Sequence, residues 1–262
     1  MIIDFHTHCY LNTLAARAIA RRPLRLPGLP NGTLRNLVAD MDRFGIARSV
    51  ILHLAHRPDN QRDVNSYAAS IQSDRLICFG SVHPLSPDAL EELERIRALG
   101  LAGVKLHPLF QRVAADDPRC FPVYERIGQL GLPVVFHCGI SSNPDTAGVC
   151  RPQQIERALP HFLNAPVICA HLGGIQNVPE QLSCLKQLPV YTDISYCAAS
   201  YPQDWVEKVL NEIPSERILF GSDTPWDSPG HQLDQLRACG LPAETMENIL
   251  WKNAHKLLNR SV

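Results

Sequence analysis

Residues 1–12, MIIDFHTHCYLN, place two histidines at the end of a short apolar run. The run from Ile2 to Phe5 is typical of a buried strand. Because alternate side chains of a strand point to the same side, His6 and His8 would project together, a few ångströms apart. This pattern suits two ligands of one metal ion, although two polar residues where a strand ends give the same pattern. The stretch also lacks the glycine-rich fingerprint of a dinucleotide-binding, doubly wound sheet.

Composition and charge exclude several classes of protein. The 262 residues carry a formal net charge of −1, with 45% hydrophobic and 19% charged residues. A full core is therefore expected, and the balanced charge gives no basis for binding nucleic acid or an anionic membrane. The nine cysteines include no CxxC pair, so they predict neither a zinc knuckle nor a disulfide framework. With no membrane-spanning run and no signal peptide, the sequence predicts a cytoplasmic protein.

Apolar, β-branched runs alternate with segments of helical periodicity along the chain. Including the first strand, eight runs are typical of strands; the other seven are ARSVILHLA (47–55), RLICFGSV (75–82), LAGVKLH (101–107), PVVFHCG (133–139), PVICAHLGG (166–174), VYTDISY (190–196) and RILFGSD (217–223). Most are followed by a helical segment, as in parallel βα units. We therefore expect an α/β protein, a single (β/α)8 TIM barrel over residues 1–262, with an open doubly wound sheet as the competing fold.

Capping residues and loop lengths add local detail. The segment 33–45, TLRNLVADMDRFG, closes on Gly45, which suits the left-handed position after a helix. In the segment 86–100, Ser86 is expected as the N-cap and Pro87 as the first helical residue. The connections 10–32 and 139–150 are longer than a barrel needs. Both follow strands, so they would lie at the C-terminal face and contribute to a substrate pocket.

Metal-binding residue types recur at the ends of other predicted strands. Lys105 and His107 end the fourth strand, His137 the fifth, His171 the sixth and Asp223 the eighth. A single histidine at a strand end is more often a hydrogen-bonded polar residue. Several imidazoles and a carboxylate gathered at one end of a barrel would, without a metal, compete for few donors. Nitrogen and oxygen ligands favour zinc, with iron, manganese and nickel as alternatives.

The ordered set of HTH, His137, His171 and Asp223 resembles the amidohydrolase superfamily over nearly the whole chain. Further stretches are similar to the branch that includes aminocarboxymuconate semialdehyde decarboxylase and related hydrolases: RDVNSYAASIQSDRLICFGSVHP (62–84), GVKLHP (103–108), HLGG (171–174), GSDTPW (221–226) and WKNAHKLL (251–258).

This resemblance implies a role for each of the strand-end residues. His6, His8 and His137 would bind the metal, and Asp223 would bind the metal or its water and shuttle a proton. His171 would bind a second metal or, in a one-metal enzyme, polarise or protonate the substrate.

The resemblance leaves two interpretations of Lys105. KLHP (105–108) is similar to the KLYP-like stretch of dihydroorotases, in which the lysine takes up carbon dioxide and its carbamate bridges two metals. In one-metal members of the branch, Lys105 would instead anchor a substrate carboxylate or pair with Asp223. The number of ions, one or two, stays open. His107 would face the substrate or support the ligands.

Substrate-binding residues are less constrained by the sequence. Arg57 and Arg25 would bind a carboxylate on the substrate, although a solvated basic loop explains them equally well. Trp226 would cover the metal, with packing of its own loop as the alternative. The expected partner is a small molecule bearing a carboxylate. A homodimer is compatible with a barrel of this size, but no surface patch in the sequence indicates one.

The leading hypothesis is a metal-dependent hydrolase of a small carbonyl compound: an amide, lactam, lactone or ester. A metal would lower the pKa of a bound water to about 7, and Asp223 would move the proton to the leaving group. The alternative is a non-oxidative decarboxylase of an unsaturated or aromatic carboxylic acid. A TatD-like metal nuclease is disfavoured, because those nucleases carry a glutamate where this chain has Lys105. An inactive binding protein is disfavoured because the ligand set has no gap.

Overall fold

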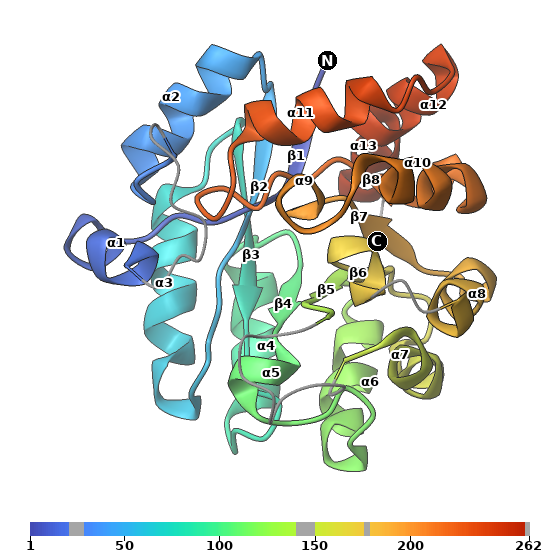
Figure 1. The fold of residues 1–262 in the computed structure, drawn as a ribbon. Coiled ribbons are helices and arrows are strands. Elements are labelled where there is room, and N and C mark those ends of the chain that lie inside the picture. Colours follow the sequence, from blue (N-terminus) through green and yellow to red (C-terminus); the bar gives the residue numbers. More distant parts are fainter. Residues whose placement is uncertain (21–28, 140–149, 176–178, 260–262) are drawn as a thin grey trace. The chain divides into compact units, whose positions relative to one another are not determined.

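The computed structural model describes residues 1–20, 29–139, 150–175 and 179–259, in which helices alternate with strands along the chain (Figure 1). One parallel sheet contains the strands in chain order: β1 (Ile3–Thr7), β2 (Arg48–Leu52), β3 (Leu76–Ser81), β4 (Val104–Leu106), β5 (Val134–Phe136), β6 (Val167–Cys169), β7 (Tyr191–Asp193) and β8 (Ile218–Leu219). This is the strand order of a (β/α)8 TIM barrel, which confirms the predicted fold class.

Helices and helical turns connect the strands. The α-helices are α1 (Asn12–Ile19), α2 (Leu34–Phe44), α3 (Gln61–Ile71), α4 (Ala89–Ala98), α5 (Pro108–Gln111), α6 (Phe121–Gln129), α7 (Pro152–Ala158), α8 (Pro179–Gln187), α9 (Cys197–Ser200), α10 (Gln203–Glu212), α11 (Pro229–Ala238), α12 (Ala243–Glu247) and α13 (Asn253–Leu258). Shorter 3-10 turns are η1 (Pro58–Asn60), η2 (Pro118–Cys120), η4 (Leu159–Phe162), η5 (His171–Gly174) and η6 (Ser215–Arg217), and η7 (Asn248–Lys252) is a π-helical turn. Among the described residues, no helix has the length and apolar character needed to span a membrane.

Internal contacts divide the chain into two compact units. The first unit comprises Met1–Ile51, Asp74–Ile77 and Asp193–Asn259; the second comprises Leu52–Ser73 and Cys78–Thr192. In the first unit β1 pairs with β2, and the Phe5 amide of β1 donates to the Phe220 carbonyl after β8 at 2.8 Å. In the second unit β4, β5 and β6 pair in register, with Val104 opposite Val134 and Val134 opposite Val167. The predicted site residues are thus divided between the units: those that follow β1 and β8 belong to the first, and those that follow β4, β5 and β6 belong to the second.

The predicted cap of α2 is confirmed, whereas that of α4 is wrong. The Thr33 side chain accepts from the Asn36 amide at 3.2 Å, and Gly45 closes α2 with φ 69°. By contrast, α4 begins at Ala89, after Asp88. Ser86 lies in a preceding turn, where its carbonyl accepts from the Ala89 amide and its hydroxyl accepts from Gln61 at 3.2 Å. This hydroxyl is therefore engaged by α3 instead of capping α4.

An aromatic cluster anchors β5 in the second unit. The Tyr124 ring of α6 stacks on Phe162 with centroids 4.5 Å apart, and the Phe136 ring meets both of them edge-on at 5.7–5.8 Å. All three side chains are at most 1% exposed. Close-packed aromatic rings tolerate little displacement, so the cluster fixes the end of β5 and with it the next residue, His137.

Candidate functional site

The predicted ligand residues of the first unit are brought together where β1 approaches the segment after β8. The Asp223 amide donates to the His6 carbonyl at 2.8 Å, and the His8 amide donates to the Thr224 carbonyl at 2.7 Å. Gly221 makes this approach possible, because a Cβ there would lie 2.8 Å from the His6 Cβ. The backbone thus sets Asp223 beside the two histidines before any side-chain contact is considered.

The side chains of His6 and His8 both direct Nε2 at one carboxylate oxygen. Asp223 Oδ1 lies 3.4 Å from His6 Nε2 and 3.1 Å from His8 Nε2. The ligand atoms of the three residues all lie within 4.8 Å of one another. His6 is fully buried, while the side chains of His8 and Asp223 keep 15% and 11% exposure. The group is sheltered, but one side of it is open to a substrate.

The backbone of Asp223 takes the left-handed conformation that an L residue adopts at a cost, with φ 63°. The Trp226 amide donates to the Asp223 carbonyl at 2.8 Å, which closes the turn directly after the carboxylate. Trp226 itself is half-buried, and its side chain is hydrogen-bonded to Tyr10. The predicted role of Trp226 as a cover over the metal stays a prediction.

A second pair of residues, which the sequence analysis did not single out, contacts the other side of His6. Asp193 Oδ2 lies 2.8 Å from His6 Nδ1, and Ser195 Oγ lies 3.0 Å from the same nitrogen. Asp193 is the last residue of β7, and all three residues are fully buried. The rule that located Asp223, a carboxylate at the end of a strand, would also have located Asp193.

A buried carboxylate lies before the histidines on β1. Asp4 Oδ1 accepts from the Ser222 amide at 2.9 Å and from the His6 amide at 3.2 Å, so it joins β1 to the segment after β8. Complete burial raises the pKa of Asp4 to about 7, although its hydrogen bonds with Ser222 and His6 oppose the shift. Asp4 thus supports the backbone that carries the ligands.

The remaining predicted residues lie at strand ends of the second unit. His137 Nδ1 lies 3.1 Å from His171 Nε2, and the His107 ring stacks on His137 with centroids 3.8 Å apart. Lys105 is 1% exposed and pairs with Val135 of β5, two residues before His137. The structure therefore brings His107, His137 and His171 into contact in this unit, with Lys105 on the strand next to β5.

The turn that carries His171 has an unusual backbone. His171, Leu172, Gly173 and Gly174 all have positive φ, between 51° and 68°. A Cβ on Gly174 would lie 2.1 Å from the amide nitrogen of Gly139, the residue that ends the β5 segment. Glycine at position 174 therefore lets the turn pack directly on the backbone beyond His137, which brings the two histidines together.

The predicted role of Arg57 and Arg25 in binding a substrate carboxylate stays a prediction. Arg57 has a side chain 62% exposed and pairs at 2.9 Å with Asp59, whose side chain is 72% exposed. Arg25 lies outside the described residues, as do the rest of 21–28 in the 10–32 connection and 140–149 in the 139–150 connection.

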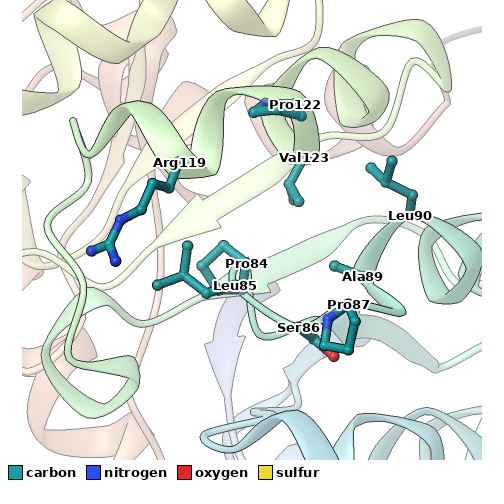
Figure 2. A pocket seen from close by; sticks show the side chains of 9 residues that line it. All are labelled: Pro84, Leu85, Ser86, Pro87, Ala89, Leu90, Arg119, Pro122 and Val123. Atoms are coloured by element: carbon teal, nitrogen blue, oxygen red, sulfur yellow. The ribbon is translucent and has the colours of Figure 1, made fainter.

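A surface hollow in the second unit contains none of the predicted site residues. It measures about 460 Å³ and lies between the turn after β3, the start of α4 and the start of α6, with apolar walls that include Leu85, Leu90 and Val123 (Figure 2). Arg119, its one charged lining residue, is bound to Asp117. The hollow offers no group suited to chemistry.

Comparison with known proteins identifies the family. The sequence matches the Amidohydrolase family over residues 3–260. The chain belongs to the amidohydrolase family. No curated protein matches it. Among solved structures, a TIM-barrel protein from Bordetella bronchiseptica is similar, with TM-score 0.81, 23% identity and coverage of 98% of each chain.

Two further solved structures share the fold of this amidohydrolase-family protein. One is named as a candidate 2-pyrone-4,6-dicarboxylic acid hydrolase from Pseudomonas putida (TM-score 0.72, 19% identity, 98% of this chain and 97% of that chain). The other is a dihydroxybenzoic acid decarboxylase from Polaromonas with bound manganese and an inhibitor (TM-score 0.71, 18% identity, 99% and 98%). Hydrolases and decarboxylases both occur on this enzyme fold, so the fold alone does not select the reaction.

The residues of the first unit fit the divalent metal that this family usually contains. Two imidazole nitrogens and a carboxylate oxygen converge, and these are the ligand types of zinc and of harder divalent ions such as manganese. In addition, Nδ1 of His6 lies within hydrogen-bond distance of the Asp193 carboxylate, and metal-ligating histidines usually have such a contact on the nitrogen that does not bind the metal.

Proposed function

We propose that this protein is a metal-dependent hydrolase of a small, carboxylate-bearing carbonyl compound. The observation that carries the proposal is the convergence of the ligand atoms of His6, His8 and Asp223 within 4.8 Å. Membership of the amidohydrolase family and the fold shared with a candidate pyrone dicarboxylic acid hydrolase support it. An amide, lactam, lactone or ester is the substrate class.

His6, His8 and Asp223 would hold the ion. A divalent ion bound there supplies Lewis acidity for a developing oxyanion and lowers the pKa of a water. Asp223 is the group suited to accept a proton and pass it to the leaving group, because its Oδ1 is the oxygen that both imidazoles face and its side chain keeps 11% exposure. The full burial of His6 restricts it to binding and leaves the substrate side to His8 and Asp223.

A non-oxidative decarboxylase of an unsaturated or aromatic carboxylic acid is the second candidate. The fold shared with a manganese-containing dihydroxybenzoic acid decarboxylase favours it. In that reaction the same residues would move a proton to carbon while carbon dioxide leaves, with no net addition of water.

The products of one experiment separate the two reactions. The protein, loaded with zinc or with manganese, is incubated with pyrone carboxylates, lactones, amides and hydroxybenzoates in 18O-labelled water. Hydrolysis puts one 18O atom into the organic product without releasing carbon dioxide, whereas decarboxylation releases carbon dioxide and leaves the organic product unlabelled. Asp223→Asn is the control that should lose either activity. Turnover by the variant equal to that of the wild type would contradict the role of Asp223.

We also propose the roles that the resemblance gives to the residues of the second unit. His137 is a further ligand, His171 binds metal or polarises the substrate, and His107 faces the substrate. Lys105→Ala distinguishes the two interpretations of the buried lysine. About two ions per chain in the wild type and fewer in the variant mean a carbamate bridge between metals. One ion in both proteins excludes the bridge and favours Lys105 as a cation that anchors a substrate carboxylate or pairs with Asp223.

A further inference from the structure

We propose that Asp193, held by Ser195, is a positioning residue that keeps the hydrogen of His6 on Nδ1 and presents Nε2 as a lone pair to the metal. This inference rests on the proposed function, because it concerns a ligand of the proposed metal. It concerns Asp193 and Ser195, which contact Nδ1 of the imidazole and to which neither the family match nor the sequence pattern assigns a role.

Two oxygen atoms lie within hydrogen-bond distance of His6 Nδ1. Asp193 Oδ2 lies 2.8 Å from the nitrogen and Ser195 Oγ lies 3.0 Å from it. The Ser195 amide donates to Asp193 Oδ1 at 3.1 Å, and the Ser195 hydroxyl contacts that same oxygen. All three side chains are fully buried, so no bulk water can take the place of any partner.

Counting donors and acceptors in this set fixes the position of the hydrogen. A carboxylate only accepts hydrogen bonds, and a serine hydroxyl has a single hydrogen to donate. That hydrogen goes to Asp193 Oδ1, so the Ser195 oxygen turns a lone pair toward His6. Both neighbours of His6 Nδ1 are then acceptors, and this nitrogen must carry hydrogen.

The opposite nitrogen of the ring is consequently free of hydrogen in the neutral imidazole. His6 Nε2 then presents its lone pair toward Asp223 Oδ1, 3.4 Å away, beside His8. Two electron pairs that face each other repel unless a cation lies between them. In the other tautomer, an Nε2–H group would donate to Asp223 and would occupy the direction that a metal needs. The hydrogen position set by Asp193 thus decides whether His6 can act as a ligand.

Replacement of Asp193 by asparagine tests the proposal. The amide keeps the size of the side chain but can donate to Nδ1 and so stabilise the wrong tautomer. The affinity for zinc and for manganese is measured by competition with a chromophoric chelator, and we expect a loss of about 10–100-fold. Ser195→Ala leaves the contact between Asp193 and His6 in place, so its expected loss is smaller than that of Asp193→Asn.

Asp227→Asn is the matched control. Asp227 is also fully buried in the first unit and lies 3.0 Å from the Nδ1 atom of another histidine, His231. This variant should lose stability as Asp193→Asn does, yet keep the metal affinity of the wild type. Thermal unfolding of all variants identifies any effect that comes from misfolding.

Nitrogen-15 NMR of the metal-free protein gives a readout that is independent of the metal. The His6 signals, assigned by their loss in His6→Gln, should show a pyrrole-like Nδ1 and a pyridine-like Nε2 in the wild type, exchanged in Asp193→Asn. An unprotonated Nδ1 in the wild type, or unchanged metal affinity in Asp193→Asn, overturns the inference. A wild type that binds neither metal contradicts the proposed function. In that case the NMR measurement still tests which ring nitrogen of His6 carries the hydrogen.

Discussion

Replacing Gly174 by alanine tests how the HLGG turn supports His171. The new Cβ would lie 2.1 Å from the Gly139 amide nitrogen and 2.2 Å from the Gly139 Cα, both backbone atoms that cannot rotate away. The backbone of Gly174 is left-handed, with φ 65°, and this conformation destabilises the folded state by about 1–2 kcal/mol when the residue has a Cβ. Overpacking against backbone adds about 1–3 kcal/mol, so we expect a loss of about 2–5 kcal/mol in the free energy of unfolding.

Gly100→Ala is the control that isolates the steric contribution. Gly100 also lies in the second unit and has φ 68°, but nothing lies within 4 Å of the position of its Cβ. Its alanine variant should lose only about 1–2 kcal/mol, and the entropy that alanine removes from the unfolded chain affects both variants equally. Equilibrium unfolding in urea measures both. Equal losses in the two variants would refute the close contact between the HLGG turn and Gly139.

Three further predictions concern single side chains. Burial raises the pKa of Asp40, so the native state keeps this proton to higher pH than the unfolded chain. Stability should therefore fall as pH rises from about 4 through the raised pKa, and Asp40→Asn should make that slope shallower in urea titrations from pH 4 to 8, where Asp4 contributes a slope of the same sign. Asn65 donates to the Ser81 carbonyl at 2.9 Å and accepts from the Ser81 amide at 2.8 Å, both buried. Asn65→Ala removes the partner of both backbone groups of Ser81, so the free energy of unfolding should drop by about 1–3 kcal/mol or more. An unchanged free energy of unfolding would exclude these hydrogen bonds. Arg57→Ala should leave stability within about 0.5 kcal/mol, because its ion pair is exposed, and should raise KM for carboxylate substrates; an unchanged KM would leave Arg57 without a substrate role.

The sequence predicts the strands and the ligands for one physical reason, the regularity of parallel βα units. Side-chain alternation in β1 is enough to put His6 and His8 on one side, and the shared direction of parallel strands is enough to expect Asp223 near them. Distances between nitrogen and oxygen atoms depend instead on how closely β8 approaches β1. That approach is set by the missing side chain of Gly221, which no periodicity reveals.

Two misses show where local patterns are insufficient. Ser86 has the residue type and the spacing of an N-cap, but its hydroxyl accepts a hydrogen bond from Gln61, a residue of another helix. Asp193 ends the strand segment VYTDISY, so its position marks it as a strand-end carboxylate but does not show what it contacts. Its function depends on which ring nitrogen of His6 it faces, and that is a tertiary contact.

The central claim is that His6, His8 and Asp223 bind a divalent metal, and the metal content per chain tests it most directly. The wild type and the His6→Ala/His8→Ala double variant are purified gently, loaded with zinc or manganese, dialysed and analysed by mass spectrometry of the elements. We expect at least one ion per wild-type chain and a loss of that ion in the double variant. A metal-free wild type, or equal metal content in the two proteins, would contradict it.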